Sequence, residues 1–144
     1  MKRLILLGLL SISIFSCTDE TFNNSLNGSW TVYSFEDLTT GSTEFKTEEN
    51  SWNMDINVKF DESKNPKTIS GKNITNQIFG EFNYTRKNQF RVNDYFESTK
   101  VNQPRWADEF VVAILDQNLS YKITGNTLVI SYNNNTKSVT LKRN

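Results

Sequence analysis

The sequence of 144 residues contains no histidine, one cysteine and two prolines. The absence of histidine excludes a catalytic triad built on histidine, a histidine-ligated metal site and an imidazole proton shuttle. A single cysteine cannot form a disulfide within the chain. The 16 basic residues equal the 16 acidic ones in number, and no basic run follows Arg3. Because nucleic-acid binding depends on concentrated positive charge, we expect no nucleic-acid partner.

The N-terminal segment differs in composition from the rest of the chain. Lys2 and Arg3 precede an apolar run over residues 4–15. This run is too short to cross a bilayer as a helix, and it indicates an export signal. Cys17 stands where the segment ends, as in the bacterial lipobox, whose cysteine is acylated and becomes the first residue of the mature chain. The alternative interpretation is an ordinary secretory signal with an incidental cysteine.

Lipidation at Cys17 would place the protein on a membrane. Fatty acyl chains such as palmitate contribute about 0.8 kcal/mol of membrane affinity per buried methylene. We therefore expect a lipid-anchored protein at the bacterial outer membrane, facing the periplasm or the cell surface. The expected organisation is a signal peptide over residues 1–16, a lipidated cysteine and polar tether over 17–25, and one domain over 26–144.

Alternation of apolar and polar residues dominates the chain from Leu26 onward and predicts antiparallel strands with one buried face. The longest alternation covers residues 51–60, where every second residue from Trp52 to Phe60 is apolar. The same pattern predicts strands at residues 29–36, 77–85, 89–93, 119–124, 127–132 and 138–142. Short turns rich in Gly and Asn join the last three, so we expect a meander at this end of the chain.

One segment has a different period. Between Pro104 and Asn118 the apolar residues, including Trp106 and Phe110, recur at spacings of three and four, which predicts a helix. Residues 110–115 are apolar on nearly all sides. We therefore expect this helix to pack against the sheet.

The order of these elements and several short strings resemble the META domain family, the HslJ-like small bacterial lipoproteins. Leu26, Gly28 and Trp30 are similar to the family's opening L-x-G-x-W string. Further similar strings lie at residues 69–82, 98–100, 109–115 and 121–130. The resemblance covers nearly all of residues 26–142.

The resemblance implies a mainly β, antiparallel barrel-like domain, similar to lipocalins, of about seven or eight strands. One helix is expected near residues 104–118, against the open end of the barrel. The family has no established enzymatic activity and has links to envelope stress. Many members carry two cysteines suited to a disulfide, whose positions hold Thr75 and approximately Gln103 here. Both cysteines are absent, as expected if the chain lacks this disulfide entirely and has not lost only one of its two cysteines.

The residues present form no convincing catalytic or metal-binding constellation. Adjacent carboxylates such as Asp61 and Glu62 point to opposite faces of a strand, so they cannot share a proton as a catalytic dyad does. No D-x-[DN]-x-[DN]-G calcium loop is present. We therefore expect no enzymatic activity, no metal and no cofactor.

The aromatic residues, 12% of the chain, allow two interpretations. In the first, they fill the barrel as its core. In the second, some of them line an internal apolar pocket, and the candidate pocket residues are Trp30, Trp52, Phe82, Trp106 and Phe110. Phe79 and Val129 fall out of phase with their strands and are candidates for an outward-facing patch.

Two functions follow from these interpretations. The first is a non-enzymatic, membrane-tethered envelope lipoprotein with a binding or structural accessory role, which would contact an envelope protein and act in envelope stress. The alternative is a lipocalin-like carrier that binds a small hydrophobic ligand inside the barrel.

Overall fold

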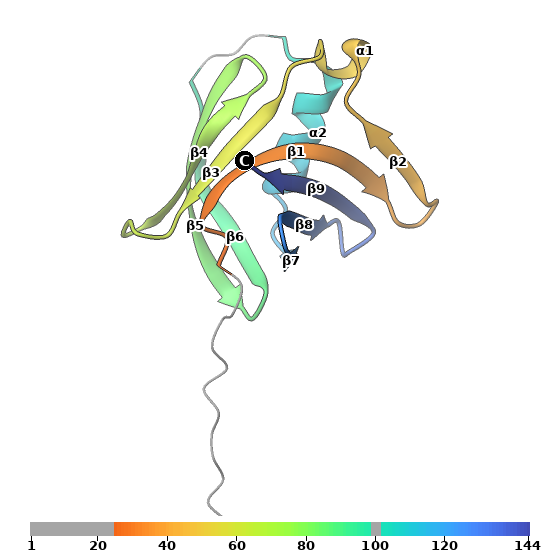
Figure 1. Cartoon of the computed structure of the whole chain (residues 1–144). Coiled ribbons are helices and arrows are strands. Elements are labelled where there is room, and N and C mark those ends of the chain that lie inside the picture. Colours follow the sequence, from red (N-terminus) through yellow and green to blue (C-terminus); the bar gives the residue numbers. More distant parts are fainter. Residues whose placement is uncertain (1–24, 99–101) are drawn as a thin grey trace, which may run out of the picture.

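The computed structural model describes residues 25–98 and 102–144, which form nine strands and two helices (Figure 1). The predicted signal peptide, Cys17 and most of the tether lie outside these residues. The elements are β1 (Gly28–Asp37), β2 (Ser42–Phe45), α1 (Glu48–Ser51), β3 (Ile56–Asp61), β4 (Lys67–Asn73), β5 (Asn76–Arg86), β6 (Gln89–Glu97), α2 (Arg105–Ile114), β7 (Leu119–Thr124), β8 (Thr127–Tyr132) and β9 (Lys137–Arg143).

Eight of the strands form a closed antiparallel barrel, and β2 extends it by one more strand. Consecutive strands pair as a meander from β3 to β9, and β1 closes the barrel by pairing with both β3 and β9. The first half of β1 lies beside β3, whereas its second half lies beside β2. The predicted mainly β, barrel-like fold is confirmed.

The alternating strand directions give the barrel two distinct ends. We call one the tether end, because residue 25 lies there with the β3–β4, β5–β6 and β7–β8 turns. The other is the helix end, which gathers α1 and the β1–β2, β4–β5 and β8–β9 turns.

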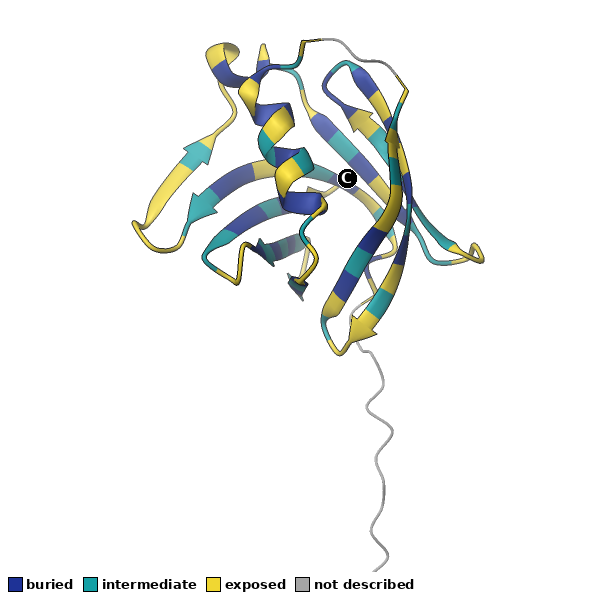
Figure 2. Cartoon of the chain, turned by 180° about the vertical axis from the view of Figure 1, so that it is seen from behind, coloured by how far each residue is buried: buried dark blue, intermediate teal, exposed yellow. Residues whose placement is uncertain are grey.

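The predicted helix is present as α2 and connects β6 to β7. These two strands pair over only two residues, Gln89 with Ser120 and Phe90 with Leu119. Figure 2 shows α2 lying between the two sides of the barrel, with buried and exposed residues alternating along it. The helix therefore closes the barrel where the strands do not. Among the described residues, every helix is too short or too polar to cross a membrane.

Aromatic side chains fill the space between α2 and the strands. Phe60 packs edge-to-face on Phe82 and Phe90, with ring centroids 5.3 and 5.9 Å apart. On the other side of the core, Phe35 packs edge-to-face on Trp106 with centroids 4.7 Å apart. Such pairs contribute about 0.5–1.5 kcal/mol beyond the burial of their area. The core is thus continuous from the strands into the helix.

The prediction of one strand over residues 51–60 is wrong in its first half. Residues 48–51 form α1, whose capping residue Thr47 accepts a hydrogen bond from the backbone N–H of Asn50. Trp52 ends this helix in the left-handed region, at φ 55°, and is 48% exposed. The strand itself begins at Ile56. The cap fixes a helical turn here, although the residue pattern favours a strand.

Gly71 allows β4 to approach β3 closely. A Cβ atom at this position would lie 2.0 Å from the carbonyl oxygen of Asn57 and 2.9 Å from the Cα atom of Val58. Both of those atoms belong to the backbone of the paired strand. The position therefore requires a residue without a side chain, which gives a physical reason for the glycine in the string at residues 69–82.

Candidate functional site

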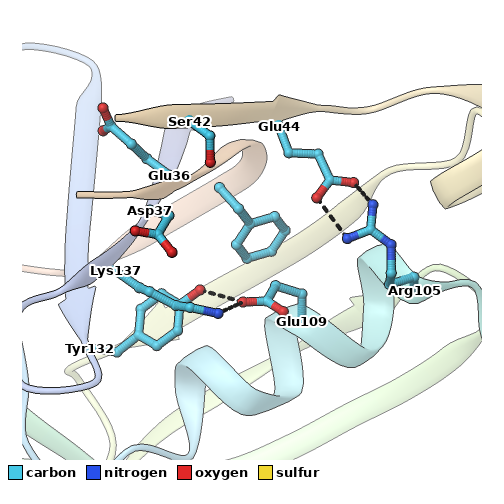
Figure 3. A pocket seen from close by; sticks show the side chains of 9 residues that line it. Glu36, Asp37, Ser42, Glu44, Arg105, Glu109, Tyr132 and Lys137 are labelled. Atoms are coloured by element: carbon cyan, nitrogen blue, oxygen red, sulfur yellow. Dashed lines mark hydrogen bonds and ion pairs between the residues drawn. The ribbon is translucent and has the colours of Figure 1, made fainter. Parts of the chain in front are cut away.

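A polar pocket of about 200 Å³ opens at the helix end, between the β1–β2 hairpin, α2 and the β8–β9 turn (Figure 3). Its lining is mostly charged. The lining residues are Phe35, Glu36, Asp37, Ser42, Glu44, Arg105, Glu109, Tyr132 and Lys137. They come from both ends of the sequence, because the barrel closes by placing β1 beside β9.

Arg105 and Glu44 form an ion pair across one side of the pocket. Arg105 Nη1 donates to Glu44 Oε2 at 2.9 Å, and Nη2 donates to Oε1. Asn50 Nδ2 donates to the same Oε1 at 2.7 Å. This paired geometry is the strongest that an arginine and a carboxylate adopt. Glu44 therefore links β2 to the first turn of α2 and to α1.

Glu109 occupies the opposite side of the pocket. Its Oε1 accepts from the Tyr132 hydroxyl at 2.7 Å and from Lys137 Nζ at 3.4 Å. Burial and the hydrogen bond to Glu109 raise the pKa of Tyr132. The Tyr132 hydroxyl therefore stays protonated and acts as a donor, which ties α2 to β8 and β9.

Glu36 and Asp37 complete the lining on β1. Asp37 Oδ1 accepts from Thr39 Oγ1 at 2.5 Å and from the backbone N–H groups of Thr39 and Thr40. These hydrogen bonds lower the pKa of Asp37. The lining thus contains four carboxylates and two cations, and both cations are already paired. Chemically, the pocket offers acceptors to a cationic or hydrogen-bond-donating group.

A second polar cluster lies deeper at the helix end, around Glu97. Its carboxylate accepts from Asn73 Nδ2 at 2.9 Å, Asn76 Nδ2 at 3.0 Å and the Tyr95 hydroxyl at 3.0 Å. Asn73 and Asn76 are buried. Burial and the nearby Glu97 raise the pKa of Tyr95. Because Asn73 and Asn76 flank the β4–β5 turn and Glu97 belongs to β6, the cluster fastens this turn to β6.

The two positions that hold cysteines in many META-like chains are in contact here. Thr75 Oγ1 donates to Gln103 Oε1 at 3.2 Å, and Gln103 Nε2 donates to the backbone oxygen of Asn73 at 3.0 Å. Hydrogen bonds therefore connect the β4–β5 turn to the segment before α2 at the point where the resemblance implies a disulfide.

Four of the five candidate residues for an internal ligand pocket lie in the packed core, and the fifth lies outside it. Trp30, Phe82, Trp106 and Phe110 are all buried in the core, each at most 2% exposed. Trp52 lies outside the barrel, after α1. The polar pocket is lined by none of the five. Cys17 lies outside the described residues.

The predicted outward-facing residues differ from each other. Phe79 is 53% exposed and lies opposite Phe96 on β6, which is 61% exposed. Val129 is half-buried. None of the charged residues of the polar pocket was predicted as a site residue from the sequence. Their spacing along the chain carries no motif, and only barrel closure brings them together.

A closed antiparallel barrel with one helix packed into its open side defines a small lipocalin-like domain, a class suited to binding or accessory roles. The META domain model matches residues 23–144. The chain therefore belongs to the META domain family, and the resemblance found in the sequence is confirmed.

Solved structures support the fold. One is an NMR structure of a protein from Burkholderia xenovorans, with a TM-score of 0.63 and 10% identity over 82% of each chain. Another is the crystal structure of a DUF4847 family protein from Bacteroides vulgatus, with a TM-score of 0.57 and 18% identity, covering 82% of this chain and 93% of that one. At these identities the similarity shows the fold alone. Among curated proteins none matches this chain.

Proposed function

We propose that the protein is a non-enzymatic, membrane-tethered envelope lipoprotein whose META domain binds a partner or serves a structural accessory role. The observation that carries this proposal is the use of the aromatic residues. Trp30, Phe82, Trp106 and Phe110 pack into the core, which favours a structural role for them over the lining of a carrier's ligand cavity.

The proposed anchor is the acylated Cys17. Eight residues lead from Cys17 to Ser25, where the described domain begins. A segment of this length spans at most about 28 Å, even when fully extended. An acylated Cys17 would therefore keep the domain close to the membrane surface.

The anchor is tested by Cys17→Ser in the native host. We expect the wild-type protein to incorporate radiolabelled palmitate and to sediment with outer membranes. The Cys17→Ser variant should lose the label, and its precursor should retain the signal peptide. Incorporation of label into this variant would refute lipidation at Cys17.

The binding role is assigned to the polar pocket at the helix end. A volume of about 200 Å³ is small for a drug-sized ligand, whose pockets measure about 300–1,000 Å³. It suits a single side chain, and the surplus of carboxylates favours a basic one. We therefore propose that a lysine or arginine of an envelope protein inserts here.

This contact is tested by NMR titration of the protein with a short Arg-containing peptide and with the same peptide carrying Gln. We expect chemical-shift changes at Glu36 and Asp37 with the Arg peptide alone. Glu36→Gln combined with Asp37→Asn should abolish them. The matched control is Glu48→Gln with Glu49→Gln, which removes the same charge from α1. Equal loss in both variants would show that net charge, and not the pocket, attracts the peptide.

The carrier alternative makes a different prediction. If an internal ligand site existed, fatty acids would change the fluorescence of the buried Trp30 and Trp106. We expect a flat response on titration with fatty acids, because both side chains are already packed. A saturable change would favour the carrier. A role in envelope stress is tested separately, by comparing a deletion strain with wild type under membrane-damaging conditions.

A further inference from the structure

Charged side chains are unequally distributed between the two ends of the barrel. At the tether end, basic residues lie in or beside the turns: Lys64, Lys67, Arg86, Lys87 and Lys122. We call these five residues the basic turns. At the helix end, acidic residues predominate, including the carboxylates of the polar pocket and those of α1. The domain thus has a basic end, although its overall charge is balanced.

The acidic residues described at the tether end, Asp61 and Glu62, keep their negative charge but are outnumbered by the five residues of the basic turns. Asp61 Oδ1 accepts from Ser63 Oγ at 2.6 Å, and its other oxygen lies 3.9 Å from Lys59 Nζ. Glu62 Oε1 accepts from the Tyr84 hydroxyl at 2.6 Å. A positive surplus therefore remains at this end.

The chain enters the domain among the basic turns. Ser25 Oγ and the backbone N–H of Asn27 donate to Glu62 Oε1 at 2.8 and 3.0 Å. The backbone N–H of Leu26 donates to the Tyr84 hydroxyl at 3.1 Å. The entry point is thus fixed between the end of β3 and the end of β5. Figure 1 shows this point beside the β5–β6 turn.

We propose that the basic turns dock on the anionic phosphate headgroups of the membrane to which Cys17 attaches the protein. The inference rests on the proposed lipidation, because the tether brings this end, and not the helix end, to the membrane. Basic residues close to an anionic surface each add attraction that falls off within a Debye length. Docking holds the barrel upright and presents the polar pocket away from the membrane.

The test uses the mature acylated protein, reconstituted in vesicles of phosphatidylcholine alone or with phosphatidylglycerol. Acetylation of individual lysines by a water-soluble reagent is followed by mass spectrometry. We expect Lys64, Lys67, Lys87 and Lys122 to react about fivefold more slowly on the anionic vesicles than on the neutral ones. Lys46 and Lys72, which lie away from this end, should react equally on both. High salt should remove the difference.

Matched variants locate the effect. Arg86→Gln with Lys87→Gln should reduce the protection of the remaining basic turns, whereas Lys46→Gln with Lys72→Gln removes the same charge elsewhere and should leave it unchanged. If the lysines of the basic turns were protected equally on neutral and anionic vesicles, the proposal would be overturned. The tether alone would then explain the slower acetylation. Protection of all lysines alike would also overturn the proposal. Failure of the protein to float with neutral vesicles would instead contradict the acyl anchor.

Discussion

The two faces of α2 are held in different ways. The inner face buries Trp106, Ala107, Phe110, Ala113 and Ile114 in the barrel. The outer face is held at the rim by Glu44 through Arg105, whose side chain is 67% exposed, and by Lys137 through Glu109. Burial of apolar area stabilises by far more than an exposed ion pair does. The inner face therefore provides most of the stability, and the rim pairs fix the position of the helix.

The largest expected effect is on the inner face. Phe110→Ala removes a fully buried ring and leaves a cavity between the helix and the strands, so it should lower the free energy of unfolding by about 3–5 kcal/mol. Urea denaturation measures this. The control is Val112→Ala on the same helix, where the side chain is 59% exposed and the loss should stay within about 0.5 kcal/mol. Similar losses in both variants would contradict the division between the two faces.

A covalent bond at the start of α2 should add stability. Thr75→Cys with Gln103→Cys places two thiols where a hydrogen bond now joins positions 28 residues apart. Closing such a loop should raise the free energy of unfolding by about 3 kcal/mol relative to the reduced form. Thiol titration and thermal unfolding, with each single cysteine variant as control, measure the effect. If the thiols stay free under oxidising conditions, the two segments do not meet as described.

The buried polar cluster should have an intermediate effect. Glu97→Gln turns an acceptor that serves three donors into an amide that is itself partly a donor. We expect a loss of about 1–3 kcal/mol in chemical unfolding, because at least one buried amide then loses its partner. Glu81→Gln on β5 makes the same change at a half-buried position and should have little effect. No difference between the two variants would mean that water replaces the lost hydrogen bond.

The rim should be the least sensitive. Arg105→Gln breaks the pair with Glu44, and we expect a loss below about 1 kcal/mol that decreases further at high salt. A double-mutant cycle with Glu44→Gln isolates the pair energy. A coupling above about 2 kcal/mol would show that the rim holds the helix as firmly as the core does.

Alternation and helical periodicity predicted most of the barrel and α2, because a half-buried strand and an amphipathic helix leave opposite signatures in the sequence. β4 was missed because Lys67–Asn73 contains few apolar residues and Gly71 interrupts their alternation. Trp52 was placed in a strand because the residues after it alternate between apolar and polar. It instead ends the short capped helix α1. The alternation of apolar and polar residues does not show where a helix cap overrides it.

The candidate sites were harder to predict than the fold. A large number of aromatic residues predicts an apolar core. The same residue types also line ligand cavities, so the sequence does not distinguish the two. Glu36, Glu44 and Arg105 meet only through barrel closure and the position of α2. The basic turns are also far apart in the sequence. Because the total charge is balanced, nothing in the composition indicates that they gather at one end. Only the resemblance to the META family brought Thr75 and Gln103 together before the structure did.

The pairing of β1 with β9 also constrains the order of events during synthesis. Thr31 and Asn144, whose side chains are hydrogen-bonded, are 113 residues apart in the chain. Contacts of such long range slow folding, because the loop between them must close first. The barrel cannot close until its last strand has left the ribosome, and an exported chain would keep β1 unpaired on that side throughout translocation. Closure of the barrel thus waits until the whole domain has been synthesised.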